Sequence, residues 1–202
     1  MLKLSALGGA LLALLAVALL LPMAQLLFAA HMVQHLLLIG IAAPLLVMAG
    51  AKIRIAPLLG WTLFVAIFLF WHWPAAFRWA ALHPAAELLE LGSILAAAWC
   101  FWSGVFGDNP LSDGARALMV MTAAVLTDLP GVVMVFAPRA ICTMPAEDAA
   151  RFGLSPLSDQ QLAGLLMWVP ANLIFFGIAA FLFARWIGAT RSHSSVLPSV
   201  SS

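Results

Sequence analysis

Two histidines four residues apart, His31 and His35, are the residues in this sequence best suited to chemistry. A spacing of i, i+4 puts both imidazoles on one face of a helix. They belong to the apolar run 26–49, where a polar side chain faces protein or a water-filled cavity rather than lipid. Imidazole pairs of this kind chelate transition metals or hydrogen-bond to neighbouring helices. The pattern predicts a metal site and leaves the hydrogen-bonded role as the alternative.

Further donor side chains fall near the same ends of neighbouring apolar runs. Asp128 lies inside a run, where a carboxylate is costly unless it is paired or functional, so its alternative role is an ion pair or a helix contact. Glu87 follows His83 by four residues. The alternative role of both Glu87 and Glu90 is in a solvated first helical turn, and this alternative suits Glu90 better than Glu87. A Cys-x-Met pair adds soft ligands that suit Cu(I). We expect the metal ligands among His31, His35, His72, His83, Glu87 and Asp128, with Cys142 and Met144 as accessory ligands.

The last apolar run begins with polar residues and carries others along its length. Gln161, Trp168 and Asn172 are spaced seven and four residues apart, so they share one side of a helix. Stripes of this kind usually face a bundle and hold helices together. We expect roles in helix packing or partner binding for Asp159, Gln160, Gln161, Trp168, Asn172 and Arg139.

These side chains belong to a chain of 202 residues that is 65% hydrophobic and 8% charged, with a mean hydropathy of +1.10. Soluble domains carry roughly a quarter charged residues, so the chain is an integral membrane protein in the lipid bilayer. A net charge of +1 argues against nucleic-acid binding, and no Gly-rich phosphate loop is present. No nucleophile–base pair or hydrolytic metal motif occurs, which predicts that the protein is not an enzyme.

Runs of about 20 apolar residues predict membrane-spanning helices. The expected fold is an all-α integral membrane protein, a polytopic bundle of six transmembrane helices, or five if the first run is a cleaved signal peptide. Pro22 closes the first run and suits a cleavage site poorly, which favours retention. A single transmembrane domain is expected over 1–191, followed by a short disordered polar tail over 192–202. The six runs cover residues 4–21, 26–49, 57–73, 84–106, 115–137 and 158–186.

Basic residues near the ends of the runs predict the orientation in the membrane. With the N-terminus in the cytoplasm, the C-terminus is cytoplasmic too, and the end that carries most histidines lies on the outer side. Acidic residues outnumber basic ones in that outer half, so its field attracts cations. The inner basic residues are Lys3, Lys52, Arg54, Arg116, Arg185 and Arg191, and the outer ones are Arg78, Arg139 and Arg151.

Several blocks of the sequence resemble the CtaG/caa3-type cytochrome c oxidase assembly family. They occur in the order of that family and cover about residues 30–186. The most specific block is the stretch 153–170. The others are His31-Met32-Val33-Gln34-His35, Ala43-Pro44-Leu45-Leu46, Trp71-His72-Trp73-Pro74, His83-Pro84 and Phe136-Ala137-Pro138-Arg139.

The resemblance implies a membrane assembly factor for a haem–copper oxidase that binds copper and passes it on. The histidines of the family's motifs correspond to His31, His35, His72 and His83 of this chain. The implied partners are cytochrome c oxidase subunits and a periplasmic copper carrier, and the implied cofactor is copper. Two alternatives remain, a metal-free scaffold for oxidase assembly and a b-type haem protein with histidine ligands.

The chain departs from many relatives at Glu87 and Leu91, where those relatives carry histidines. A site built from histidines and a carboxylate is harder than an all-histidine or methionine-rich site. It suits Cu(II) or Zn(II) at least as well as Cu(I).

Overall fold

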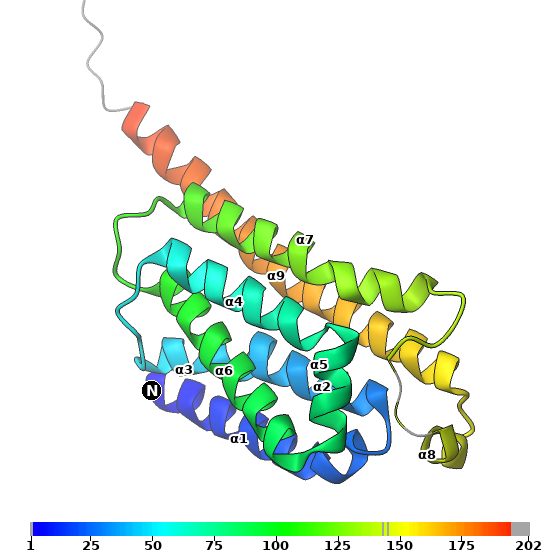
Figure 1. The fold of residues 1–202 in the computed structure, drawn as a ribbon. Helices are drawn as coiled ribbons and strands as arrows, with labels where there is room; N and C mark the ends of the chain where they lie inside the picture. The colour runs from blue at the N-terminus through cyan, green and yellow to red at the C-terminus, as the bar shows by residue number, and fades with distance from the viewer. Residues whose placement is uncertain (1, 143, 145, 195–202) are drawn as a thin grey trace, which may run out of the picture.

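The protein is an elongated bundle of helices that run along one long axis (Figure 1). A computed structural model describes residues 2–142, 144 and 146–194, and these residues contain helices but no strand. The elements are α1 (Leu2–Ala24), α2 (Phe28–Leu37), the π-helical segment η1 (Leu38–Ala42), α3 (Ala43–Ala49), α4 (Pro57–Trp71), α5 (Pro74–Leu82), α6 (Pro84–Phe106), α7 (Asp113–Phe136), α8 (Ala146–Arg151) and α9 (Pro156–Ser194).

The architecture confirms the expected all-α membrane fold. Five helical units of the described chain are long and apolar enough to cross a membrane, and a sixth is added if α4 and α5 together form one bent span. The five units are Leu2–Ala24, Phe28–Ala49, Pro84–Phe106, Asp113–Phe136 and Pro156–Ala189.

The third expected span, residues 57–73, ends two residues early, and a separate helix follows it. α4 ends at Trp71 after 15 residues, and α5 continues at an angle of 72°. The residue before a proline avoids helical backbone, and Trp73, which precedes Pro74, is extended with φ −71° and ψ 132°. The proline therefore ends the straight span and leaves His72 at the corner between the two helices.

The first and last helices also pass their expected ends. Pro22 lies inside the first helix, which continues to Ala24. The last helix is 39 residues long with Pro170 inside it. It continues through Ser194, so the first three residues of the expected disordered tail are helical. Residues 195–202 of that tail lie outside the described residues.

The second span changes its helical pitch immediately after His35. Residues 38–42 form the π-helical segment η1, which links α2 to α3. In a π-helical turn the backbone hydrogen bonds span five residues instead of four. The indole Nε1 of Trp102 donates to the carbonyl of Ile39 in this turn at 2.7 Å. Gly40 allows α9 to approach closely, since a Cβ there would lie 2.8 Å from Ile174 Cδ1. Packing from α6 and α9 thus supports the altered turn.

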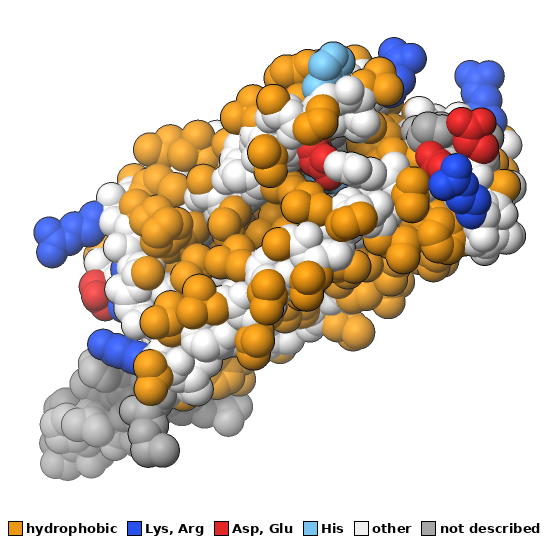
Figure 2. Space-filling view, turned by 90° about the horizontal axis from the view of Figure 1, so that it is seen from below, with side chains coloured by type: hydrophobic (Ala, Val, Ile, Leu, Met, Phe, Trp, Pro, Cys, Tyr) orange, Lys and Arg blue, Asp and Glu red, His pale blue; other side chains and the backbone are white. Residues whose placement is uncertain are grey.

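Helices α7 and α9 pack through small residues. A Cβ on Gly164 would lie 2.8 Å from the carbonyl oxygen of Gly131, and a Cβ on Gly131 would lie 3.2 Å from the carbonyl oxygen of Gly164. Only residues without side chains allow two membrane helices to approach this closely. Hydrophobic side chains cover most of the face shown in Figure 2, while charged side chains lie mainly toward its ends.

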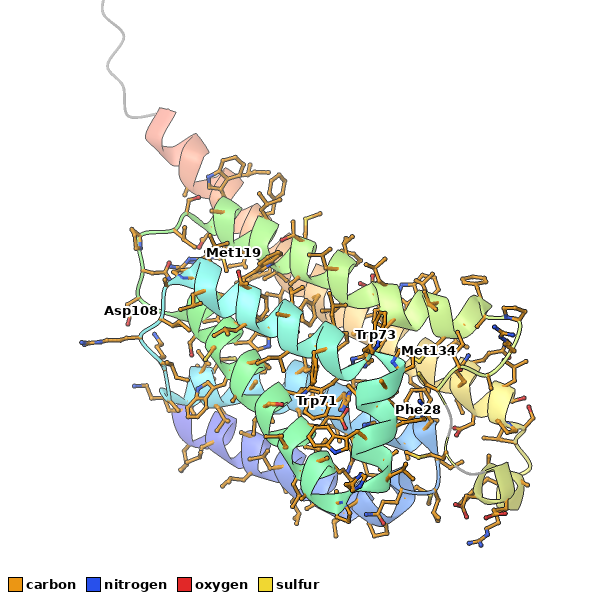
Figure 3. All side chains as sticks on the ribbon, in the orientation of Figure 1. Phe28, Trp71, Trp73, Asp108, Met119 and Met134 are labelled. Carbon is orange, nitrogen blue, oxygen red and sulfur yellow. The ribbon has the colours of Figure 1, made fainter. Side chains whose placement is uncertain are left out.

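The helix connections divide between the two ends of the bundle. One end holds the start of α1 and the loop before α7, with Asp108 3.4 Å from Lys52. The opposite end holds α5 and α8, and Figure 3 places Phe28, Trp71 and Trp73 toward it, away from Asp108. Connections that the six-span topology places on one side of the membrane therefore lie at one end of the bundle. Which end faces the cytoplasm remains a prediction.

Candidate metal centre

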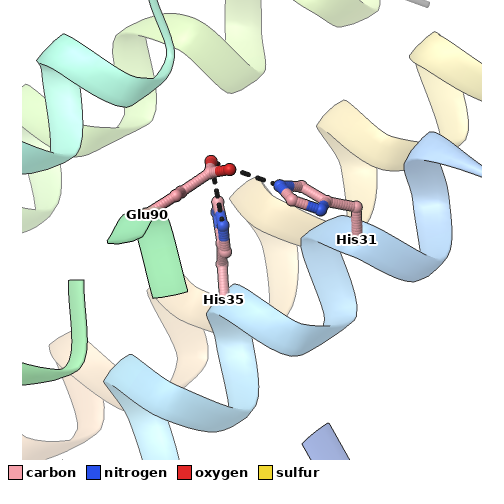
Figure 4. Close-up of side chains that lie close together, drawn as sticks. All are labelled: His31, His35 and Glu90. Carbon is pink, nitrogen blue, oxygen red and sulfur yellow. Dashed lines mark hydrogen bonds and ion pairs between the residues drawn. The ribbon is translucent and has the colours of Figure 1, made fainter. Parts of the chain in front are cut away.

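Two histidines of α2 and one glutamate of α6 meet inside the bundle (Figure 4). His31 Nε2 lies 3.2 Å from Glu90 Oε1, and His35 Nε2 lies 3.3 Å from the same oxygen. The two imidazole rings are 4.6 Å apart between centroids, in an edge-on arrangement. All three residues are at most 2% exposed. One carboxylate oxygen is therefore shared by two buried imidazoles.

The start of α2 is held in place by an acidic side chain of α9. Asp159 accepts hydrogen bonds from the backbone N–H groups of Phe28 at 2.8 Å and Ala29 at 3.0 Å. These are unpaired donors of the first helical turn, and a carboxylate there also complements the helix dipole. Asp159 is 1% exposed. This cap sets the position of α2 one turn before His31.

Helix α6 presents Glu90 two turns after its first residue. Pro84 at the first helical position is compatible with helix initiation because its missing N–H needs no partner there. Trp71 of α4 donates to Ser93 Oγ at 2.8 Å, and Ser93 donates to the carbonyl of Glu90 at 3.0 Å. Glu90 is thus held between α2 and α4.

His72 lies beside the three-residue group. Its ring is 5.4 Å from the ring of His35 between centroids and stacks on Phe68 at 4.1 Å. Its Nδ1 bonds to the carbonyl of Phe68 at 2.7 Å, so that nitrogen carries the proton and Nε2 is left with a lone pair. Nε2 is buried and has no hydrogen-bond partner. It is therefore available as a further ligand.

Several polar atoms of this group are buried without a hydrogen-bond partner. They are Nδ1 of His35, Nε2 of His72 and Oε2 of Glu90. Buried polar atoms of this kind normally have partners, and each costs about 1–3 kcal/mol when left without one. Two ligand bonds of about 2.0–2.1 Å at a tetrahedral angle separate donor atoms by roughly 3.3 Å. The observed 3.2 and 3.3 Å separations fit a shared cation.

Among the described residues, His31, His35 and Glu90 form the group of ligand side chains compact enough for a metal, with donor atoms within 4.8 Å of one another. Glu87, the carboxylate expected from the sequence, is instead 3.3 Å from Gln25 Nε2. The sequence favoured a solvated first turn slightly more for Glu90 than for Glu87, but Glu90 is 1% exposed. The signal that could have identified it is spacing along α6. Glu90 comes four residues before Ile94, so both side chains lie on the buried face of the helix.

The remaining expected ligands lie outside this group. His83 is exposed, and its Nδ1 bonds to the carbonyl of Trp79 at 3.0 Å. Asp128 Oδ2 accepts from Asn172 Nδ2 at 2.9 Å. Asp128 also lines a cavity of about 30 Å³ together with His35. Asp128 therefore borders the same cavity as His35 but lies outside the compact ligand group.

Cys142 and Met144 are buried at 5% and 6% exposure. Burial raises the pKa of the Cys142 thiol to about 11, which disfavours the thiolate that binds metals. Gln160 accepts from the backbone N–H of Cys142 at 2.9 Å and donates to the carbonyl of Met134 at 3.0 Å. Gln160 therefore joins the 141–142 loop to α7.

The other polar residues of the last span contact α7. Gln161 Nε2 donates to the carbonyl of Val135 at 3.3 Å, and the ring of Trp168 meets that of Phe136 edge-on at 6.4 Å. Together with the Asn172 hydrogen bond, these contacts join α9 to α7. Arg139 is exposed in the loop that follows α7.

The arrangement can bind a cation in a site shielded from lipid and water. Phe77 of α5 contacts the His31 ring edge-on at 5.9 Å and packs on Phe28 at 4.5 Å. Helix α5 thereby covers His31 at the end of the bundle that holds α5 and α8. Two imidazoles and a carboxylate provide donors with one formal negative charge, which neutralises part of the charge of a bound metal ion.

A family model described as cytochrome c oxidase caa3 assembly factor (Caa3_CtaG) matches residues 4–189. This range contains every helix that contributes to the centre. No curated protein gives a significant match. No solved structure does so either.

Proposed function

This chain belongs to the family of cytochrome c oxidase caa3 assembly factors, and from this membership we propose that it binds copper for delivery to the oxidase. His31, His35 and Glu90 are the proposed ligands, and His72 is the fourth. The observation that carries the proposal is the sharing of one buried carboxylate oxygen by two imidazole nitrogens, at 3.2 and 3.3 Å.

The donor set determines which form of the metal the site favours. Imidazole and carboxylate ligands suit Cu(II) and Zn(II), whereas thiolate and thioether ligands select Cu(I). No sulfur atom belongs to the compact group of described residues. We therefore propose a preference for Cu(II) over Cu(I) in the isolated protein.

The dimensions of the site favour an ion over haem. Haem held by two histidines requires a flat pocket between the rings, and pockets for small molecules have volumes of roughly 300–1,000 Å³. The His35 and His72 rings are 5.4 Å apart and in edge contact. The adjoining cavity is about 30 Å³.

We place the centre toward the periplasmic side of a bacterial inner membrane, with both termini in the cytoplasm. The excess of basic residues at the opposite end of the bundle supports this orientation. In the proposed sequence a periplasmic carrier supplies copper, and ligand exchange then passes it to the copper-bearing subunit of the oxidase. His72, at the corner of the broken span, is the ligand placed to exchange first because it lies outside the compact group of His31, His35 and Glu90.

The proposal is tested by metal binding to the purified full-length protein in detergent. Cu(I), Cu(II) and Zn(II) are added separately, unbound metal is removed, and the bound metal is measured by elemental analysis. We expect stoichiometric Cu(II) in the wild type and little in the His31→Ala/His35→Ala double variant. His83→Ala is the matched control because His83 is exposed and outside the group.

The same variants are then expressed in cells that lack the native copy, and oxidase activity is measured. Loss of both copper binding and oxidase activity in the double variant supports delivery. A wild-type protein that binds no metal, together with full oxidase activity in the double variant, identifies the metal-free scaffold instead.

A further inference from the structure

We propose that one or two buried water molecules link the metal ligand His35 to Asp128, and that Asp128 is a positioning residue for this histidine. This proposal adds a positioning residue to the proposed copper site, and its effect on copper binding rests on the proposed function. It concerns a cavity between α2, α4, α7 and α9.

His35 is one of the polar residues that line the cavity. The two nitrogens lie on different edges of an imidazole ring, and Nε2 is the one near Glu90. Nδ1 is buried and has no hydrogen-bond partner. A volume of about 30 Å³ holds roughly one or two waters.

The polar lining of the cavity offers two acceptors, the Thr127 hydroxyl and the Asp128 carboxyl, of which an ionised carboxylate is the stronger. Its polar side chains are those of His35, Thr127 and Asp128, among otherwise apolar neighbours. The Thr127 hydroxyl already donates to the carbonyl of Ala123 at 2.9 Å. Asn172 holds one carboxylate oxygen of Asp128 at 2.9 Å, which leaves the other oxygen for water.

Metal chemistry gives this link a role. A histidine that binds a metal through one nitrogen carries a proton on the other, and that N–H normally donates to a carboxylate, a carbonyl or water. For His35 to bind through Nε2, its Nδ1–H needs an acceptor. When Nε2 holds a metal, a water bridge to Asp128 supplies that acceptor; in the metal-free protein, where Nε2 faces the Glu90 carboxylate, the same water donates to Nδ1.

The test compares wild type, Asp128→Leu, Asp128→Asn and Ala171→Val in the full-length protein. Ala171 also lines the cavity, and the larger side chain displaces water without altering Asp128. Nitrogen NMR of histidine-labelled metal-free protein reports the hydrogen bond at His35 Nδ1, and chelator competition reports Cu(II) affinity. Asp113→Asn is the control, since this residue is on the same helix but pairs with Arg185 at 3.1 Å.

We expect Asp128→Leu and Ala171→Val to lose the hydrogen bond at Nδ1 and to bind Cu(II) about 10–100-fold more weakly. Asp128→Asn retains an acceptor and should keep the hydrogen bond, with a smaller loss of affinity. An unchanged Nδ1 signal and an unchanged affinity in Ala171→Val overturn the proposal, even if Asp128→Leu fails to fold. A wild type that binds no copper refutes the proposed function, while the Nδ1 signal still tests the water bridge.

Discussion

The two glutamates of α6 provide the sharpest test of the centre because they lie one helical turn apart on the same helix. Glu90 contacts both histidines, whereas Glu87 contacts Gln25. Replacement of each by glutamine preserves the shape of the side chain and removes its charge. We expect Glu90→Gln to lower Cu(II) affinity strongly and Glu87→Gln to leave it nearly unchanged.

The size of the effect follows from burial and geometry. Glu90 is 1% exposed, and its Oε1 lies 3.2 and 3.3 Å from the two imidazoles. Mutation of groups that only orient a metal ligand costs about 10–100-fold in metal affinity. Loss of the anionic ligand itself should reach at least this range. Glu87 lies outside the compact ligand group, so Glu87→Gln should change Cu(II) affinity by about twofold or less.

The assay is chelator competition for Cu(II) with each purified variant, after thermal unfolding has shown that both remain folded. Equal affinities in the two variants, or a larger loss in Glu87→Gln, refute the assignment of Glu90 as a ligand. A loss of oxidase activity in Glu90→Gln with unchanged copper affinity would show that Glu90 acts in docking rather than in metal binding.

Three further predictions follow from the contacts that hold the fold together. Asp159→Ala should lower the free energy of unfolding by about 1–2 kcal/mol because it removes the cap of α2; chemical denaturation measures this, with the partly exposed Asp148→Ala as the control. Gly164→Val should destabilise the protein by about 1–3 kcal/mol, while Gly177→Val on the same helix, where a Cβ meets nothing within 4 Å, should change the thermal midpoint little. The Cys142 thiol, with its pKa raised to about 11 by burial, should stay protonated near neutral pH. Maleimide labelling should therefore be slow there and should accelerate as the pH rises toward 11, whereas fast labelling at neutral pH would contradict the burial.

Most of the fold could be predicted because lipid imposes simple constraints. A spanning helix needs about 20 apolar residues, and the expected run 84–106 coincides with α6. The third run was expected to end at Trp73, close to the end of α4 at Trp71, whereas the helix α5 that follows Pro74 was not expected. The π-helical segment 38–42 has no apolar periodicity of its own and depends on packing against Trp102.

The candidate site was only partly predictable. His31 and His35 could be paired because both lie on one helix and their spacing alone puts them on one face. The choice between Glu87 and Glu90 depends on how α6 is rotated and how deeply it lies against α2, and neither is encoded locally. The role of Asp159 was equally hidden, since it caps a helix 131 residues away in the chain.

The π-helical segment also gives the second span a tolerance for changes in its length. One residue more than an α-helix requires is accommodated there, so deletion of a single residue from 38–42 would restore a regular α-helical turn and leave His31 and His35 facing Glu90. A one-residue deletion in a regular α-helix, by contrast, turns the residues on its two sides by about 100° relative to each other. Related chains could therefore lose one residue at this turn and keep both the bundle and the grouping of His31, His35 and Glu90.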